Sequence, residues 1–302
     1  MSDPTTREIP ACPAPPKQQP PAVRFVVPVG AVDTHAHVIG VPPEFPFVES
    51  RSYTPPAATA EAYIEMLDCT GMTYGVLVQV SVHGTDNRLL MSTLEHYPKR
   101  LRGIAVMPLG LPDSEYQRAK DAGVVGLRLN VLYGGGIGFN SLLEYGALAK
   151  SMQWHLQFLV DVRQLPELAP KIGKLPVDFV VDHMGHFPAH LGSHDPGFQT
   201  LLALVRDGGW VKLSGAYRIS ETGLPYADTV PYARLLAEAA PDRCVWGSDW
   251  PHVANWGYMM TVGDLLDTFY EWVPDDALRN RILVENPQRL YGFPSPMKIS
   301  VG

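Results

Sequence analysis

From residue 31 onward, short runs of apolar and often β-branched residues alternate with longer segments in which apolar positions recur every three or four residues. The first pattern is typical of buried strands, and the second is typical of amphipathic helices. The pattern predicts eight strands, at residues 32–38, 74–80, 101–107, 124–131, 155–162, 177–182, 210–214 and 243–247. It predicts helices at residues 59–71, 86–96, 142–152, 165–172, 198–205 and 232–240, and another that starts at 112–114; helical patterns also fill residues 262–290.

Eight strand-then-helix units in succession predict a parallel sheet, because each parallel crossover needs a helix to carry the chain back. Eight units in about 260 residues fit an α/β fold of the (β/α)8 TIM-barrel type, as a single domain, better than an open doubly wound sheet. The doubly wound fold is the alternative, and it usually has a glycine-rich phosphate loop after its first strand. The first strand here ends in His35-Ala36-His37, without that loop.

The N-terminal segment differs in composition from the rest of the chain. Residues 1–28 hold eight of the 29 prolines and few large apolar residues. Proline-rich runs favour an extended, polyproline-like backbone. We therefore expect a proline-rich arm at residues 1–28 and a barrel domain at residues 29–302. The arm could wrap over the barrel or a neighbouring subunit, or it could form a loosely ordered tail.

Charge and cysteine content exclude several classes of protein. The chain has 24 basic and 31 acidic side chains and a net charge of −7, which argues against nucleic acid as the main partner. Its three cysteines lie far apart, so neither a disulfide framework nor a cysteine zinc site is expected. Neither a membrane-spanning run nor a signal-peptide pattern occurs. We expect a cytoplasmic protein with no nucleic-acid or membrane partner, and a homo-oligomer is compatible with the sequence.

The residues that could carry chemistry stand at predicted strand ends, where the catalytic residues of a (β/α)8 barrel lie. His35 and His37 follow the first strand, His183 the sixth and Asp249 the eighth. His35 and His37 are two residues apart, so their side chains lie on the same face. Any one of the four could be an ordinary core or capping residue. Their shared position at strand ends favours one catalytic and metal-binding group.

Several motifs carry a family resemblance, which extends over about residues 30–293. The chain resembles the amidohydrolase superfamily, in its lactonase-type branch, which includes 2-pyrone-4,6-dicarboxylate lactonase and 4-sulfomuconolactone hydrolase. The resemblance implies a lactone (carboxylic ester) hydrolase, with Asp249 as the general base and with His35, His37 and His183 binding a metal or polarising the carbonyl group. The matching segments are residues 33–37, 79–87, 182–185, 246–252 and 286–291.

The metal requirement has two alternatives. Three histidines and one aspartate, namely His35, His37, His183 and Asp249, suit one zinc ion. The fifth strand ends without the lysine or histidine that bridges two metals in many superfamily members, which argues against a dinuclear site. The resemblance also leaves a metal-free mechanism open, because pyrone dicarboxylate lactonase works without a metal. We favour one zinc ion.

The resemblance also implies an anionic substrate. Arg128 and Arg218 match positions where the pyrone lactonase places arginines for substrate carboxylates, and a guanidinium suits carboxylate or sulfonate groups. A flexible loop, Tyr133-Gly134-Gly135-Gly136, replaces a basic pair of that lactonase. Fewer cations indicate a non-planar lactone, such as a sulfonated or carboxylated muconolactone from aromatic catabolism. Other candidates for substrate contacts, each of which could be an ordinary polar loop residue, are Tyr53, Ser81, His83, Asn130, His186 and Asn255.

Two rivals to lactone hydrolysis remain at this point. The first is a metal-dependent decarboxylase of the same superfamily that acts on an aromatic or enoic acid. The second is a ligand-binding barrel without enzymatic activity. They differ from a hydrolase in what they release: a hydrolase yields one proton per turnover, a decarboxylase yields carbon dioxide, and a binding protein yields neither.

Overall fold

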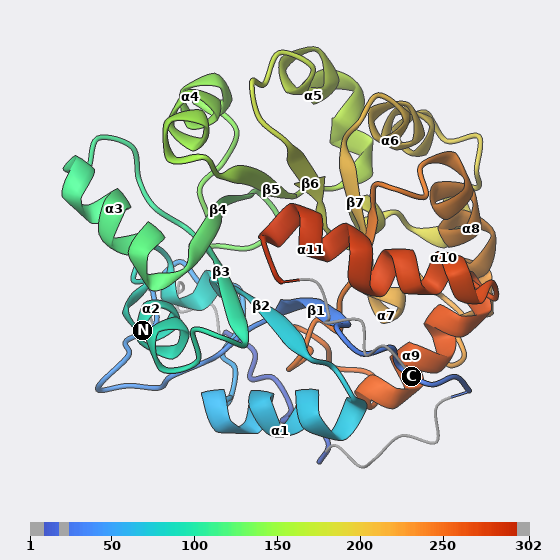
Figure 1. Ribbon diagram of the computed structural model, residues 1–302, viewed down its shortest axis with the longest axis horizontal. Coiled ribbons are helices and arrows are strands. Elements are labelled where there is room, and N and C mark those ends of the chain that lie inside the picture. The colour runs from blue at the N-terminus through green and yellow to red at the C-terminus, as the bar shows by residue number, and fades with distance from the viewer. Residues whose placement is uncertain (1–8, 18–23, 295–302) are drawn as a thin grey trace, which may run out of the picture.

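The computed structural model describes residues 9–17 and 24–294. Its strands form one parallel sheet in the order β1 to β8, with helices around the outside (Figure 1). This confirms the (β/α)8 barrel and excludes the doubly wound sheet, whose strand order reverses at its centre. The strands are β1 (Val32–Ala36), β2 (Tyr74–Val78), β3 (Leu101–Ala105), β4 (Val124–Asn130), β5 (His155–Leu159), β6 (Phe179–Val181), β7 (Trp210–Leu213) and β8 (Cys244–Trp246).

The helices follow the predicted segments, with differences at their ends. The helical patterns predicted over residues 262–290 form successive helices. Pro274 separates the first from the second, and the Asp275 side chain caps the second by accepting a hydrogen bond from the backbone N–H of Leu278. The helices are α1 (Ala60–Thr70), α2 (Arg88–His96), α3 (Asp113–Ala122), α4 (Leu142–Met152), α5 (Leu165–Ile172), α6 (Pro196–Arg206), α7 (Ala216–Ile219), α8 (Val230–Ala239), α9 (Val262–Trp272), α10 (Asp276–Asn280) and α11 (Asn286–Tyr291).

The barrel closes between β1 and the residues that follow β8. The backbone N–H of His37 donates to the carbonyl of Trp250 at 2.8 Å, and that of Asp249 donates to the carbonyl of His35 at 2.8 Å. The Asp33 carboxylate joins the same two segments, since it accepts hydrogen bonds from the backbone N–H and the hydroxyl of Ser248, both at 2.7 Å. Closure of the barrel therefore sets the distance between the first histidine motif and Asp249.

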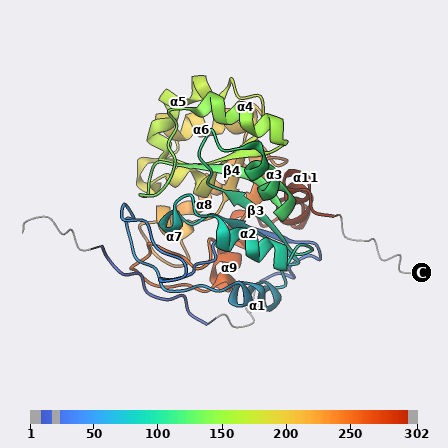
Figure 2. The same ribbon diagram turned by 90° about the vertical axis from the view of Figure 1, so that its left-hand side faces the viewer.

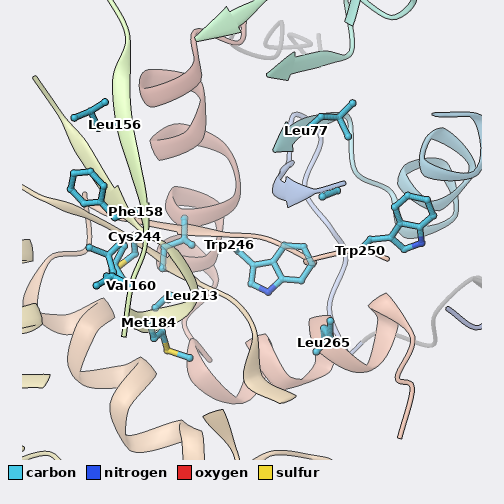
Figure 3. Close-up of a cluster of buried hydrophobic side chains, with 14 of the residues drawn as sticks. Leu77, Leu156, Phe158, Val160, Met184, Leu213, Cys244, Trp246, Trp250 and Leu265 are labelled. Atoms are coloured by element: carbon cyan, nitrogen blue, oxygen red, sulfur yellow. The ribbon is translucent and has the colours of Figure 1, made fainter. Parts of the chain in front are cut away.

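Apolar side chains fill two regions, one between the strands and helices and one inside the barrel. In the outer region Phe158 of β5, Leu213 of β7 and Leu265 of α9 belong to one buried cluster (Figure 3). Inside the barrel Val76 packs in a smaller cluster with Tyr291 of α11. Figure 2 shows α11 on one side of the barrel and α7 with the long loops on the other. The C-terminal ends of the strands open on the side of α7, which directly follows β7.

The described parts of the N-terminal arm lie against the barrel. The backbone N–H of Cys12 donates to the carbonyl of Thr54 at 2.8 Å, and the indole N–H of Trp256 donates to the carbonyl of Ala11 at 2.8 Å. Phe25 stacks on Tyr270 of α9, with 6.3 Å between ring centroids. The rest of the expected arm, at residues 1–8 and 18–23, lies outside the described residues. Within the described ranges, no helix combines the length and apolar character needed to cross a membrane.

Candidate active site

The four predicted catalytic residues meet at the C-terminal end of the barrel. His35 Nε2 lies 3.8 Å from Asp249 Oδ1, His37 Nε2 lies 3.7 Å from the same oxygen, and His183 Nε2 lies 3.7 Å from Asp249 Oδ2. All four side chains are buried, with at most 3% of their surface exposed. The strand-end rule therefore correctly brings together residues that are more than 200 positions apart in the chain.

Strained backbone conformations hold two of these residues in place. His183 lies in the left-handed region at φ 49°, and Asp249 lies there at φ 60°. Such conformations cost about 1–2 kcal/mol for a residue with a side chain, and they collect at functional sites. The chain turns sharply after β6 and after β8, and these turns direct the imidazole and the carboxylate toward the barrel axis.

Close packing also fixes His35. A side chain at Gly247 would bring its Cβ within 2.7 Å of the His35 Cβ, so only glycine fits beside that histidine. His35 Nδ1 faces the barrel interior, where it lies 3.4 Å from Asp182 Oδ1 and 3.3 Å from Lys212 Nζ. Burial and the nearby charge of Lys212 lower the pKa of His35 to about 4, so this ring is neutral at physiological pH.

The two oxygens of Asp249 have different surroundings. Oδ2 accepts hydrogen bonds from Arg218 Nε at 2.6 Å and from the Tyr217 hydroxyl at 2.7 Å. Oδ1 is buried, has no hydrogen-bond partner among the described residues, and faces His35 of β1 and His37, which follows that strand. Burial alone would raise the pKa of this carboxyl, but Arg218 and the neighbouring histidines hold it well below its usual value. Asp249 is therefore ionised, with one oxygen held and one available as a base.

The donor set fits a divalent metal ion. His37 Nδ1 lies 2.7 Å from the carbonyl oxygen of Val78, which only accepts, so Nδ1 carries the proton and Nε2 a lone pair. Burial holds the pKa of His37 well below its usual value, so the ring stays neutral. Its Nε2 lone pair and Asp249 Oδ1 thus face each other at 3.7 Å without a proton between them. His35 Nε2 also lacks a partner among the described residues and faces the same oxygen. These atoms are arranged to share a cation.

A second buried group of charges lies inside the barrel, on the Nδ1 side of His35. Lys212 of β7, fully buried, donates to the carbonyl of Thr34 at 2.7 Å and to Gln157 Oε1 at 2.8 Å, and lies 3.4 Å from Asp182 Oδ1. Arg128 of β4 donates to Asp182 Oδ2 from Nη2 at 3.2 Å and from Nε at 3.3 Å. Burial lowers the pKa of Lys212 to about 8, whereas Lys212 and His35 hold that of Asp182 well below its usual value. This network approaches His35 at Nδ1 and holds the ring in place.

The two predicted anion-binding arginines already have protein partners. Arg128 pairs with Asp182, as described above, and its side chain is 4% exposed. Arg218 donates to Asp249, to the Tyr133 hydroxyl at 3.2 Å and to the carbonyl of Val253 at 2.9 Å. Arg218 thus contacts the predicted base directly, which the sequence did not reveal.

The other predicted substrate-binding residues divide into two groups. Tyr53, Ser81, His83 and His186 line the same end of the barrel: the Tyr53 hydroxyl lies 3.0 Å from Ser81 Oγ, and His186 stands 5.2 Å from His183 between ring centroids. The His186 Nε2 atom is buried and has no hydrogen-bond partner in the described chain. His83 lies at the same end of the barrel, and its Nε2 is 3.1 Å from the carbonyl oxygen of Gly40.

The second group, Asn130 and Asn255, bonds within its own loops. Asn130 accepts from the backbone N–H groups of Leu132 and Tyr133, and Asn255 donates to the carbonyl of Tyr258. Contacts of either asparagine with a substrate stay a prediction.

The loop with three consecutive glycines is packed down, contrary to the flexibility expected from its sequence. A Cβ at Gly134 would lie 1.7 Å from the carbonyl oxygen of Ser50, and one at Gly135 would lie 2.1 Å from that of Ser81. Close approach to the loops after β1 and β2 explains the glycines. The packed loop places Tyr133 above Arg218.

Sequence reasoning missed four residues of this site: Asp182, Lys212, Gln157 and Tyr217. Lys212 interrupts the otherwise apolar strand β7, and Gln157 stands between two apolar residues of β5. A lysine is almost never fully buried unless it is paired. That signal was available in the sequence. Tyr217 has no comparable signal, because its contact with Asp249 depends on where the short helix α7 begins.

Comparison with known proteins agrees with this geometry. The family model described as Amidohydrolase matches residues 32–293. A 4-sulfomuconolactone hydrolase of Rhizobium radiobacter is 38% identical over 293 residues, which cover 94% of this chain and 97% of that protein. A 2-pyrone-4,6-dicarboxylate hydrolase of Comamonas testosteroni is 35% identical over 285 residues, which cover 90% of this chain and 93% of that protein.

A solved structure supports the same relationship. The crystal structure of a probable 2-pyrone-4,6-dicarboxylic acid hydrolase from Acinetobacter baumannii, with citric acid bound, superimposes with a TM-score of 0.78. The two sequences are 31% identical, and the match covers 88% of this chain and 100% of that chain. Structures of a 2,6-dihydroxybenzoate decarboxylase from Rhizobium are only 14–15% identical and share the fold alone.

Proposed function

Because this chain belongs to the amidohydrolase family, we propose that it hydrolyses a small anionic lactone with water that Asp249 activates. One observation carries the proposal: Asp249 Oδ2 is held by Arg218 and Tyr217, while Oδ1 is buried, unpaired within the described chain and directed at His35 and His37. A carboxylate held in this way is suited to accept a proton from water.

Ring opening requires one water molecule and two proton transfers. Asp249 Oδ1 takes a proton from the water molecule while the water oxygen attacks the lactone carbonyl carbon. The negative charge that develops on the carbonyl oxygen needs donors or positive charge close by, and we propose that the group formed by His35, His37 and His183 provides for it, as carbonyl-polarising or metal-holding residues. When the ring C–O bond breaks, the proton on Asp249 passes to the departing ring oxygen. The product is a hydroxy acid, whose new carboxyl group releases one proton at neutral pH.

We propose that one zinc ion completes this site. The residues that would hold it are His35, His37, His183 and Asp249; the facing lone pairs of His37 Nε2 and Asp249 Oδ1 support this assignment. When bound, zinc lowers the pKa of water toward about 7 and polarises a carbonyl group. Asp182, which approaches His35 Nδ1, would then accept the proton of that ring nitrogen and orient the ring, as carboxylates commonly do for metal-bound histidines.

The substrate class follows from the charges around the site and from the relatives. The related enzymes are named for 4-sulfomuconolactone and 2-pyrone-4,6-dicarboxylate, both anions, and the related crystal structure holds citric acid. Arg218 and Arg128 lie beside the catalytic group here, and His186 presents a ring nitrogen that has no partner among the residues the structure describes. We propose a muconolactone or pyrone that carries carboxylate or sulfonate groups, from the breakdown of aromatic or sulfonated aromatic compounds.

Proton release tests the reaction. The purified enzyme is mixed with 4-sulfomuconolactone, carboxymethyl muconolactone or 2-pyrone-4,6-dicarboxylate in weak buffer, and protons and carbon dioxide are both measured. We expect one proton per lactone consumed and no carbon dioxide. Carbon dioxide without proton yield would establish a decarboxylase instead, and binding without turnover would leave a ligand-binding barrel.

Three further expectations stay proposals. We propose a cytoplasmic enzyme, since the relatives are named for small-molecule substrates. We propose that residues 1–28 form an arm separate from the barrel domain at 29–302, supported by the extended path of residues 9–17 along the mouth loops. A homo-oligomer is the third proposal, and sedimentation of the purified protein would test it.

A further inference from the structure

Tyr133 stands at the boundary between solvent and the buried base. Its side chain is partly exposed, whereas the side chains of Arg218 and Asp249 beneath it are 7% and 0% exposed. The Tyr133 hydroxyl accepts a hydrogen bond from Arg218 Nη1 at 3.2 Å, and Arg218 Nε donates to Asp249 Oδ2 at 2.6 Å. A continuous line of contacts therefore runs from a group that solvent reaches to the base.

The protein holds Tyr133 from several sides. The Asn130 amide binds both backbone groups of Tyr133, accepting from its N–H at 3.2 Å and donating to its carbonyl at 3.3 Å. Gly134 and Gly135 let the following backbone pack against the loops after β1 and β2, as described above, and the backbone N–H of Gly134 donates to Ser52 Oγ at 3.0 Å. The Tyr133 ring meets the ring of Tyr53 edge-on, at 5.6 Å between centroids. Little freedom remains for its hydroxyl.

The Tyr133 hydroxyl and Arg218 keep donors that have no partner among the described residues. The Tyr133 hydroxyl accepts from Arg218, and its own proton has no acceptor within the described ranges. Arg218 has five N–H groups, of which three have partners in the described chain: Asp249, Tyr133 and the carbonyl of Val253. One O–H and two N–H groups are thus available side by side, and the guanidinium charge strengthens the donor character of the hydroxyl. An oxyanion is the ligand that suits such donors.

We propose that Tyr133 is a specificity-determining residue, whose hydroxyl joins Arg218 in receiving one oxyanion group of the substrate, a carboxylate or a sulfonate. This inference rests on the proposed lactone hydrolysis and adds to it the position of the anionic group. Arg218 then performs two tasks, because the same guanidinium holds Asp249. The asparagine clamp and the three glycines serve to place one hydroxyl.

The test compares the wild-type enzyme with Tyr133→Phe, which removes only the hydroxyl. For lactones that carry a carboxylate or a sulfonate, we expect KM to rise about ten- to hundredfold, as for loss of one hydrogen bond to a charged group, with a smaller change in kcat. For the methyl ester of the carboxylated lactone, which lacks the charge, we expect KM to change less than twofold. The two anionic substrates show which of the two groups the site prefers.

Tyr258→Phe is the matched control, because Tyr258 lies in the loop after β8 and is 69% exposed. We expect it to leave KM unchanged for every substrate. An equal change in KM for charged and methyl ester substrates in Tyr133→Phe would overturn the inference and leave Tyr133 as a packing residue. Unchanged KM for all of them would overturn it as well.

Citrate binding separates this inference from the proposed function. Calorimetry measures its Kd for wild type and for Tyr133→Phe, and needs no catalysis. A Kd that rises about tenfold or more in the variant supports the subsite even if wild type hydrolyses no lactone, in which case only the proposed function fails. Equal affinity of the two proteins, or no citrate binding by wild type, together with failure to hydrolyse any lactone, would overturn both.

Discussion

Removal of either member of the buried Asp182–Lys212 pair tests the charge network beneath the site. Asp182→Asn keeps the shape of the side chain but leaves two buried cations, Lys212 and Arg128, without their carboxylate. Breaking a buried pair in this way costs about 3–5 kcal/mol of the free energy of unfolding. Lys212→Met instead leaves two buried acceptors, the Thr34 carbonyl and Gln157 Oε1, without their donor. Each such acceptor lowers the free energy of unfolding by about 1–3 kcal/mol, and burial of the apolar methionine side chain offsets part of this loss. We expect a loss of about 2–4 kcal/mol.

The double variant separates an ion pair from two independent losses. Once Asp182 is neutral, removing the lysine charge relieves repulsion with Arg128, so the two losses should fall short of additive by about 1–3 kcal/mol. Urea unfolding followed by tryptophan fluorescence measures the four proteins, with equal m-values as the requirement for comparison. Lys150→Met, at an exposed position of α4, is the control and should change the free energy by less than about 0.5 kcal/mol. Additivity within about 0.5 kcal/mol would refute the coupling.

Three other expectations concern the site itself. Asp249→Asn should lower kcat about a hundredfold or more in the proton-release assay with unchanged circular dichroism, and wild-type kcat in the variant would remove Asp249 as the base. Zinc analysis by plasma mass spectrometry should find about one ion per chain in wild type and far less in His37→Gln, whereas full activity in metal-free enzyme would leave hydrogen-bond donors alone to polarise the carbonyl. Gly247→Ala should cost about 1–3 kcal/mol of stability and lower kcat, because its Cβ would displace His35; a variant with wild-type stability and kcat would show that the 2.7 Å contact is easily relieved.

Periodicity along the chain was enough to predict the barrel. An apolar run such as that of β2 is buried on both faces whatever its neighbours are, and a helix must follow it for the next strand to be parallel. The strand-end positions of His35, His37, His183 and Asp249 follow from the same local pattern. The helical patterns predicted over residues 262–290 are confirmed as successive helices, which the structure divides at Pro274.

The pairing of charges across the barrel could not be predicted from local patterns in the sequence. Arg218 could be predicted near the mouth, but its contact with Asp249 depends on the left-handed turn at Gly215 and on the start of α7. The Gly134–Gly136 segment has a composition typical of flexible loops, and only the structure reveals the neighbouring backbone against which it packs.

The amino-acid sequence by itself determined the fold and the end of the barrel at which the chemistry lies, because both depend on patterns of a few neighbouring residues. The tertiary structure alone decided which oxygen of Asp249 is held and which is available, and that Lys212 lies beneath His35. Those contacts join residues 31 to 214 positions apart, and spacing along a chain carries no measure of the distance between side chains across a barrel.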